Sequence, residues 1–218
     1  MKTAYHGNQY IGLFGKANDK VVFLPHDANK SFFYAVKERM GAEVVKTSIL
    51  QSNLIGIYMA LTESFAILPH DIPSYEEEVI SQHVEVVKIK SRFNAWGNNI
   101  VVGKSVIANP HIGENEIKKI EDALGKEVFR KSIAGYSTVG SLLCRTSKGF
   151  VVHYKASDEE MRFLEDALGV RGSRATVNMG NGFVSIGMMA NSKGYVVGEG
   201  TTGIEIARIE EGLGYLEG

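Results

Sequence analysis

The chain has 218 residues, of which 44% are hydrophobic and 22% charged, and its formal net charge is −1. These values are ordinary for a globular protein with a sizeable core, and they exclude a low-complexity chain. A protein that holds nucleic acid mainly by neutralising phosphates is usually basic. We therefore expect any contact with nucleic acid to be local, or to be shared with a protein partner.

The cysteine content and the hydropathy pattern indicate where the protein works. Cys144 is the only cysteine, so no internal disulfide can form. This is compatible with a reducing compartment, and we expect a cytoplasmic protein. The first nine residues lack the apolar core of a signal peptide, and the sequence contains no run of about 18 apolar residues that would span a bilayer. We therefore expect no membrane partner.

A repeated tetrapeptide is the strongest sequence signal. The sequence Leu-Pro-His-Asp occurs at residues 24–27 and again at residues 68–71. Each copy lies at the same distance from an upstream Ile-Gly pair, at residues 11–12 and 55–56. A period of about 20 to 50 residues is typical of repeat architectures.

The repeat predicts a strand hairpin in every unit. Each unit has an apolar run that follows a polar turn, and another apolar run, such as residues 54–61 or 139–144, comes before that turn. Two apolar runs joined by a tight polar turn indicate an antiparallel hairpin. The second strands are expected at residues 21–24, 65–68, 106–108, 150–152 and 195–197.

A helix is predicted after each hairpin. Ser157 and Glu160 have the spacing of a capping box, apolar residues follow at helical intervals, and Gly169 ends the helix. The other helices are expected near residues 29–40, 74–83, 117–124 and 206–213. Residues 76–78 are all glutamate and fit the first turn of a helix, where negative charge is favoured.

A third strand follows the first four helices, so each unit reads strand, strand, helix, strand. These strands are expected at residues 44–49, 84–89, 128–133 and 173–177. The fifth unit has none, and the N-terminal residues 1–6 are left to complete it. We therefore predict a single closed α/β ring domain over residues 1–218, five-fold pseudosymmetric, with helices outside and open sheet edges removed. Its units are approximately 7–50, 51–92, 93–135, 136–179 and 180–218.

Five such units resemble the pentein, or α/β-propeller, architecture, and the residues resemble the translation initiation factor 6 family of ribosome anti-association factors. The resemblance covers essentially the whole chain, and the order and spacing of its motifs carry it. The sequence also lacks the C-terminal extension of eukaryotic members, as in an archaeal-type member. The motifs are Asn-Leu-Ile-Gly at 53–56, Gly-Asn at 97–98, Thr-Val-Gly-Ser at 138–141, Lys-Gly at 148–149, Val-His at 152–153, Thr-Val-Asn at 176–178 and Thr-Thr-Gly-Ile-Glu at 201–205.

The resemblance implies a binding protein and not an enzyme, with no catalytic residue, cofactor or metal. A member of this family binds the intersubunit face of the large (50S) ribosomal subunit, where ribosomal proteins beside the sarcin–ricin loop and large-subunit rRNA form its contact. Bound there, it prevents association with the small (30S) subunit, and a role in large-subunit maturation is expected. We expect no DNA partner, and a monomer, because a closed ring leaves no sheet edge.

The resemblance also implies which residues meet the ribosome. They are Gly12, Ile57, Asn98, Leu142 and Phe183, on one face of the ring. Ile57 and Leu142 depart from eukaryotic members, which tend to have an arginine and a tyrosine there. We expect Leu142 and Phe183 to be exposed and to form an apolar anchor instead.

Two other functions compete with this interpretation. Some penteins are hydrolases that act on guanidino compounds with a cysteine nucleophile and a histidine, for which Cys144 and His153 are the candidates. Because Cys144 lies inside an apolar run, we expect a buried structural thiol. A scaffold that presents a broad face to several partners, without ribosome specificity, is the other alternative.

Several further motifs have structural explanations. The two Pro-His-Asp sequences contain metal-ligating residue types, but they occupy equivalent positions in different units, so we expect no metal site. The glycines at the start of the first strands are expected to allow close packing at the ring axis. The Gly-Asn-Asn sequence at 97–99 fits a turn, a binding role or both, and Trp96 fits either the core or the binding face. The four glycines expected to pack closely at the ring axis are Gly12, Gly56, Gly97 and Gly140.

Overall fold

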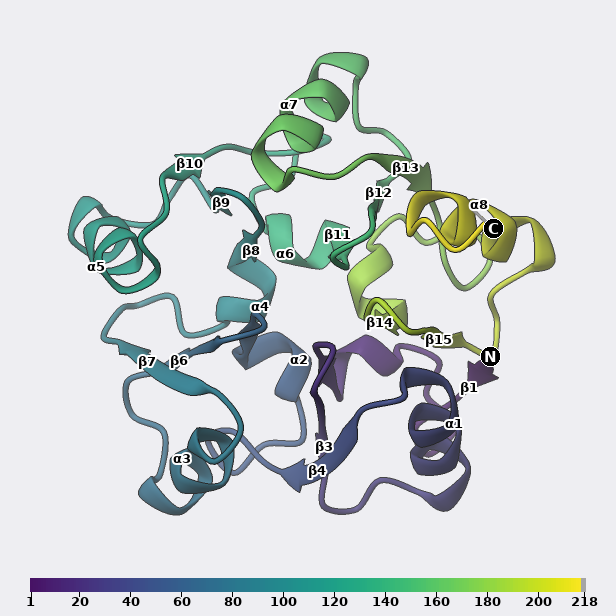
Figure 1. The fold of residues 1–218 in the computed structure, drawn as a ribbon, viewed down its shortest axis with the longest axis horizontal. Helices are drawn as coiled ribbons and strands as arrows, with labels where there is room; N and C mark the ends of the chain where they lie inside the picture. Colours follow the sequence, from purple (N-terminus) through teal and green to yellow (C-terminus); the bar gives the residue numbers. More distant parts are fainter. Residues whose placement is uncertain (217–218) are drawn as a thin grey trace.

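In the computed structural model, which describes residues 1–216, five three-stranded sheets lie around a common centre (Figure 1). In every sheet the middle strand pairs antiparallel with the first strand and parallel with the third. The predicted hairpins are therefore confirmed, and the architecture is mixed α/β.

The strands fall into three equivalent sets. The first strands are β2 (Lys16–Ala17), β5 (Ala60–Leu61), β8 (Ile100–Val102), β11 (Leu143–Arg145) and β14 (Met188–Ala190). The middle strands are β3 (Val21–Pro25), β6 (Phe65–Pro69), β9 (Val106–Ala108), β12 (Phe150–His153) and β15 (Tyr195–Gly198). The third strands are β4 (Glu43–Thr47), β7 (Glu85–Ile89), β10 (Val128–Arg130), β13 (Gly172–Ala175) and β1 (Lys2–Thr3).

Strand β1 joins the two ends of the chain. Lys2 pairs with Val197 and Thr3 with Gly198, in parallel register, so the N-terminal strand completes the sheet of the last unit. The backbone N–H of Val197 also donates to the carbonyl oxygen of Met1. The predicted closure of the fifth sheet by the N-terminal segment is confirmed.

Five longer helices lie at the outside of the molecule (Figure 1). Three end where a glycine adopts the left-handed conformation: Gly41 with φ 53°, Gly125 with φ 60° and Gly169 with φ 73°, the last as the sequence predicts. The capping box of Ser157 and Glu160 is present. The helices are α1 (Lys30–Met40), α3 (Ser74–Ser81), α5 (Glu114–Leu124), α7 (Asp158–Leu168) and α8 (Gly203–Gly212).

Each middle strand is buried on both faces, which explains its continuous apolar sequence. In β3, Val21 and Phe23 pack in the cluster that contains Ile80 of α3, whereas Val22 and Leu24 pack in the cluster that contains Phe32 of α1. Alternate side chains of one strand thus serve two cores, one on each side of the sheet. Each outer helix is therefore held between two neighbouring sheets.

The start of each unit differs from the prediction. Residues 54–61 and 139–144 were expected to be strands, but each begins as a short helical turn and becomes a strand only afterwards. A four-residue apolar turn has no periodicity that separates it from a strand. The five turns are η1 (Ile11–Leu13), α2 (Ile55–Tyr58), α4 (Trp96–Asn99), α6 (Val139–Leu142) and η2 (Val184–Gly187).

No helix within residues 1–216 is both long and apolar enough to cross a membrane.

Candidate functional site

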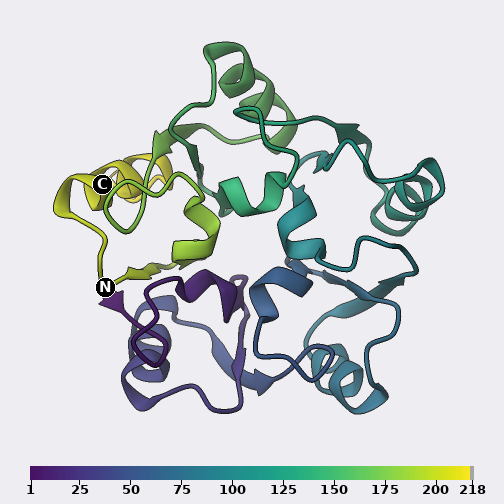
Figure 2. The ribbon, with the colours of Figure 1, turned by 180° about the vertical axis from the view of Figure 1, so that it is seen from behind.

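The five short helical turns, here called the central turns, form an inner ring around the middle of the molecule (Figure 2). Each contacts the next along the ring: η1 with α2, α2 with α4, α4 with α6, α6 with η2, and η2 with η1. Segments from the whole length of the chain therefore meet at one place. A surface made there would combine residues from the units of all five sheets.

Glycine at the second position of four central turns permits this contact. A Cβ added to Gly56 would overlap the carbonyl oxygen of Gly12, and one added to Gly97 would overlap that of Gly56. In the same way, a Cβ added to Gly140 would overlap the carbonyl oxygen of Gly97, and one added to Gly12 would overlap the carbonyl oxygen of Ser185. The predicted close packing of these four glycines is confirmed. The sequence did not reveal Ser185, which takes the fifth position.

All five residues expected to meet the ribosome lie on or beside the central turns. Gly12 is the second residue of η1, Ile57 and Asn98 are the third residues of α2 and α4, and Leu142 is the fourth of α6. Phe183 directly precedes η2. The five therefore share one part of the molecule, but they do not occupy equivalent positions within the turns.

The expected exposure of Leu142 is wrong. Its side chain is fully buried, in a cluster with Ile107 and Val139, because the fourth position of this turn points into the core. Gly12 is buried as well. Phe183 is half-buried, with its ring centroid 5.0 Å from that of Tyr136. Leu142 therefore cannot act as an apolar anchor on the surface, and Phe183 offers only part of its ring.

The third position of the turns is better placed for contact with a partner. Four of the five residues there are half-buried and so present part of their surface, and the fifth, Ser141, is buried. Aligning the five units on their central turns would have identified these third-position residues, but the sequence analysis did not predict the turns. The four are Leu13, Ile57, Asn98 and Ile186.

The two asparagines of α4 have different environments. The Asn99 side chain donates to the Ala95 carbonyl oxygen at 2.8 Å and accepts from the Asn109 amide at 2.6 Å. Asn98 is half-buried, and its side chain makes no hydrogen bond within residues 1–216. Asn99 therefore fixes the turn, while Asn98 keeps its amide available. Trp96 is fully buried and belongs to the core.

Tight loops surround the central turns, and several contain residues with positive φ. Leu50 and Gln51 have φ of 55° and 58°, and Asn178 and Met179 have 50° and 63°. Short bridges close these loops, for example between Ile49 and Ser52. Such a conformation is unfavourable for residues other than glycine, so the loops need support from the rest of the unit.

A glutamate at the third position of the outer helix supplies that support. Glu76 accepts from the backbone N–H groups of Leu50 at 2.7 Å and Gln51 at 2.9 Å. Glu205 accepts from Gly180 at 2.8 Å and from the Thr176 hydroxyl at 2.7 Å. Glu76 thus links the loop at residues 50–51 to α3, and Glu205 links the loop at residue 180 to α8.

Hydrogen bonding keeps Glu205 ionised. Burial acts to raise the pKa of this carboxyl group, but the hydrogen bonds from Thr202, Thr176 and Gly180 outweigh it, and the pKa is lowered below the ordinary value of 4.5. The side chain is 7% exposed, so the charge is held inside the protein.

The two Leu-Pro-His-Asp sequences have separate structural roles. Asp27 accepts from the Tyr5 hydroxyl at 2.6 Å and from the Asn53 amide, which links the first two units. His70 and Asp71 follow β6 and bond to each other at 3.0 Å. Within residues 1–216, no three His, Cys, Asp or Glu side chains gather as metal ligands.

Cys144 and His153 lie in different environments. Cys144 is 9% exposed, and burial raises the pKa of its thiol to about 11, which disfavours the thiolate. The Nδ1 atom of His153 accepts from the Lys155 backbone N–H at 3.1 Å, and its ring packs against Tyr136 and Phe183. The cysteine belongs to a different cluster, with Met188 and Val197. This geometry favours the predicted structural thiol.

The chain resembles known proteins over its full length. A family model described as the eIF-6 family matches residues 1–212. The chain is 35% identical to translation initiation factor 6 of Pyrococcus horikoshii, with 97% of each chain covered. It is 34% identical to the factor of the same name from Thermococcus onnurineus, with 99% of this chain and 98% of the relative covered. The same identity is found with the Haloquadratum walsbyi protein, over 100% and 97% of the two chains. The chain therefore belongs to the eIF-6 family.

Proposed function

We propose that this protein binds the large (50S) ribosomal subunit on its intersubunit face and prevents the small (30S) subunit from joining. Membership of the eIF-6 family and the shared name of its relatives, translation initiation factor 6, support a role in translation. The observation that carries the finer proposal is the convergence of the five expected contact residues on the central turns.

The proposed contact is the face that bears the central turns and the loops before them, with Asn98 at its centre. Asn98 offers an amide that can both donate and accept, and Leu13, Ile57 and Ile186 lie at the matching positions of their turns as partly exposed apolar groups. Tyr136 and Met179, 38% and 74% exposed, lie on the surrounding loops. A mixed apolar and amide surface of this kind fits a protein partner better than a bare phosphate backbone.

The partners that follow are ribosomal proteins beside the sarcin–ricin loop, together with large-subunit rRNA. A net charge of −1 is compatible with a contact that protein shares with RNA. The proposal includes a monomer, a cytoplasmic location and a role in large-subunit maturation. It also treats residues 1–218 as one closed pentein-type propeller, a reading supported by the five sheets and by the β1–β15 pair.

Co-sedimentation with purified ribosomal subunits tests the proposal. Wild-type protein should travel with the large subunit, and Asn98→Asp should reduce the bound fraction, because it places a charge in a contact face. Gln82→Glu is the matched control: it makes the same amide-to-carboxylate change at an exposed site at the end of α3. Equal loss in both variants, or no loss in either, would show that the face is wrongly chosen. Binding to both subunits alike would favour a general scaffold.

A further inference from the structure

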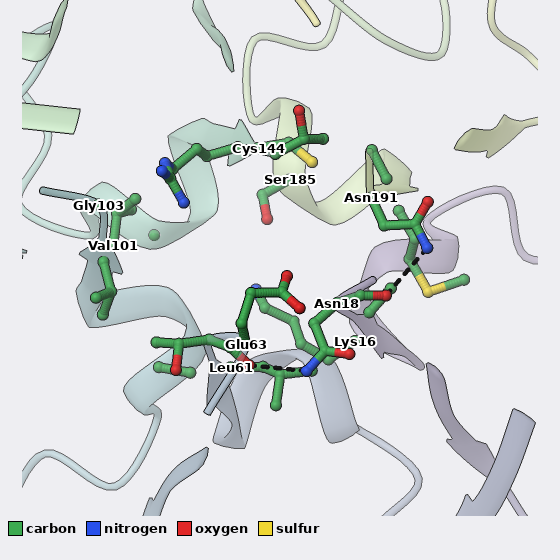
Figure 3. A pocket seen from close by; sticks show the side chains of 18 of the residues that line it. Lys16, Asn18, Leu61, Glu63, Val101, Gly103, Cys144, Ser185 and Asn191 are labelled. Carbon is green, nitrogen blue, oxygen red and sulfur yellow. Dashed lines mark hydrogen bonds between the residues drawn. The ribbon is translucent and has the colours of Figure 1, made fainter. Parts of the chain in front are cut away.

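A cavity of about 340 Å³ lies among the first strands of the units (Figure 3). Gly12, Gly140 and Ser185 of the central turns line one part of it. Another part is lined by turns that join first and second strands, where Asp19 and Glu63 lie. The cavity is thus lined by segments from all over the chain, and the proposed function gives it no role.

Two cationic side chains line this cavity without a partner. Lys16 comes from β2 of the first unit and Arg145 from β11 of the fourth. Neither side chain makes a hydrogen bond or an ion pair with any of residues 1–216, and the Nε atom of Arg145 is completely buried. Burial is the main cause of a lowered pKa in both groups, because the charged form of each side chain is less stable away from water.

The other charged side chains of the lining offset this pair only in part: the charge of Glu63 acts to raise the pKa of Arg145, but burial outweighs it, and the two groups form no ion pair. Asp19 accepts from the Ser192 backbone N–H at 2.6 Å, and Glu63, exposed at the rim, accepts from the Asp19 backbone N–H at 3.2 Å. Lys126 donates to the Gly103 carbonyl oxygen at 2.8 Å. The lining therefore carries three cations and two carboxylates, and Lys16 and Arg145 are the two of these cations whose side chains make no hydrogen bond within residues 1–216.

We propose that this cavity binds a small free oxyanion of the phosphate class, held between Lys16 and Arg145. A guanidinium group matches the geometry of a phosphate through two parallel N–H donors, while an ammonium group supplies a compact second charge. The Ser185 hydroxyl lines the cavity beside them and can donate a further hydrogen bond. The volume of about 340 Å³ accommodates phosphate or pyrophosphate.

Isothermal titration calorimetry with inorganic phosphate tests the site, in a buffer free of other oxyanions and with chloride matched for ionic strength. Wild-type protein should bind one phosphate per chain. Lys16→Met and Arg145→Met should each lower the affinity at least tenfold, and Arg145→Lys, which keeps the charge but loses the two parallel donors, should fall between them and wild type. Lys155→Met removes a cation on the exposed surface and should leave the affinity unchanged.

Three results would overturn the proposal. They are no heat from phosphate beyond the chloride control, unchanged affinity in both cavity variants, and binding of a short RNA oligonucleotide without any response to inorganic phosphate. Circular dichroism confirms that each variant is folded, and loss of a buried unpaired charge should not itself unfold the chain. Because the proposed ribosome contact is on the central turns, large-subunit binding by Lys16→Met reports separately on that proposal.

Discussion

Gly56 stands directly against the carbonyl oxygen of Gly12, across the contact between the first two central turns. The same relationship links Gly97 to Gly56 and Gly140 to Gly97, so each turn is seated on the backbone of the one before. The atoms that an added Cβ would meet are backbone atoms, so no flexible side chain could move aside to make room for it. The inner ring is therefore as intolerant of added volume as any part of the core.

Gly56→Ala should lower the free energy of unfolding by about 3 kcal/mol, the upper end of the usual cost of added volume, because its Cβ overlaps backbone and the turn must shift. Urea denaturation measures this. Gly203→Ala is the control, since a Cβ there meets nothing within 4 Å and alanine favours the first turn of α8. Equal stability of the two variants would contradict the seating of the central turns on each other.

Glu205→Gln should cost about 1–3 kcal/mol at pH 7, because the loop at residues 177–181 and the start of α8 lose charge-assisted hydrogen bonds. The pKa of Glu205 is lowered in the folded protein, so its contribution is complete above 4.5 and is lost as the pH falls through the folded value. The difference between wild type and variant should therefore shrink in acid. The measurement is urea denaturation between pH 3 and 7, values that span the ordinary carboxyl range.

Glu211→Gln provides the comparison for that experiment. Glu211 is an exposed partner of Arg208 at 3.1 Å, and surface pairs of this kind contribute little. A loss as large as that of Glu205→Gln, or a loss at Glu205 that does not vary with pH, would argue against the anchoring role.

Lys16→Met should stabilise the protein in phosphate-free buffer, by about 1–3 kcal/mol at pH 7, because it removes a half-buried, cavity-lining cation that has no protein partner within residues 1–216. The pKa of Lys16 is lowered from 10.5, so the penalty is complete at low pH and is relieved as the pH rises through the folded value toward 10.5. The gain should therefore diminish in alkaline buffer. A destabilised variant at neutral pH would mean that Lys16 has a stabilising contact inside the cavity.

Cys144 should react slowly with a thiol reagent in the native protein at pH 8 and rapidly in denaturant. Burial raises the pKa of this thiol to about 11, so little thiolate is present. Following the absorbance of the released thiolate measures the rate. Rapid native reaction, together with hydrolysis of a guanidino compound that Cys144→Ala abolishes, would restore the hydrolase interpretation.

The sequence predicts the strands and helices best where one environment acts along a whole element. The middle strand β3 is buried on both faces, so its apolar run is uninterrupted. The helices α5 and α7 end at Gly125 and Gly169, where glycine adopts a left-handed conformation at little cost. The N-terminal strand could be inferred because the fifth unit lacked one.

The central turns could not be predicted in the same way. A four-residue apolar turn such as α6 has no periodicity of its own, and only the neighbouring backbone holds it in place. The burial of Leu142 follows from that turn and was missed with it. Lys16 and Arg145 are 129 positions apart in the sequence, and only the arrangement of the units in space brings both to one cavity.

Sucrose-gradient sedimentation of purified archaeal ribosomal subunits tests the central claim most directly. Large and small subunits are mixed under conditions that favour joining, with wild-type protein, Asn98→Asp or Gln82→Glu. We predict that wild type and Gln82→Glu travel with the large subunit and reduce the peak of joined ribosomes, and that Asn98→Asp does both less well. Protein that stays at the top of the gradient while the subunits join normally would contradict the account.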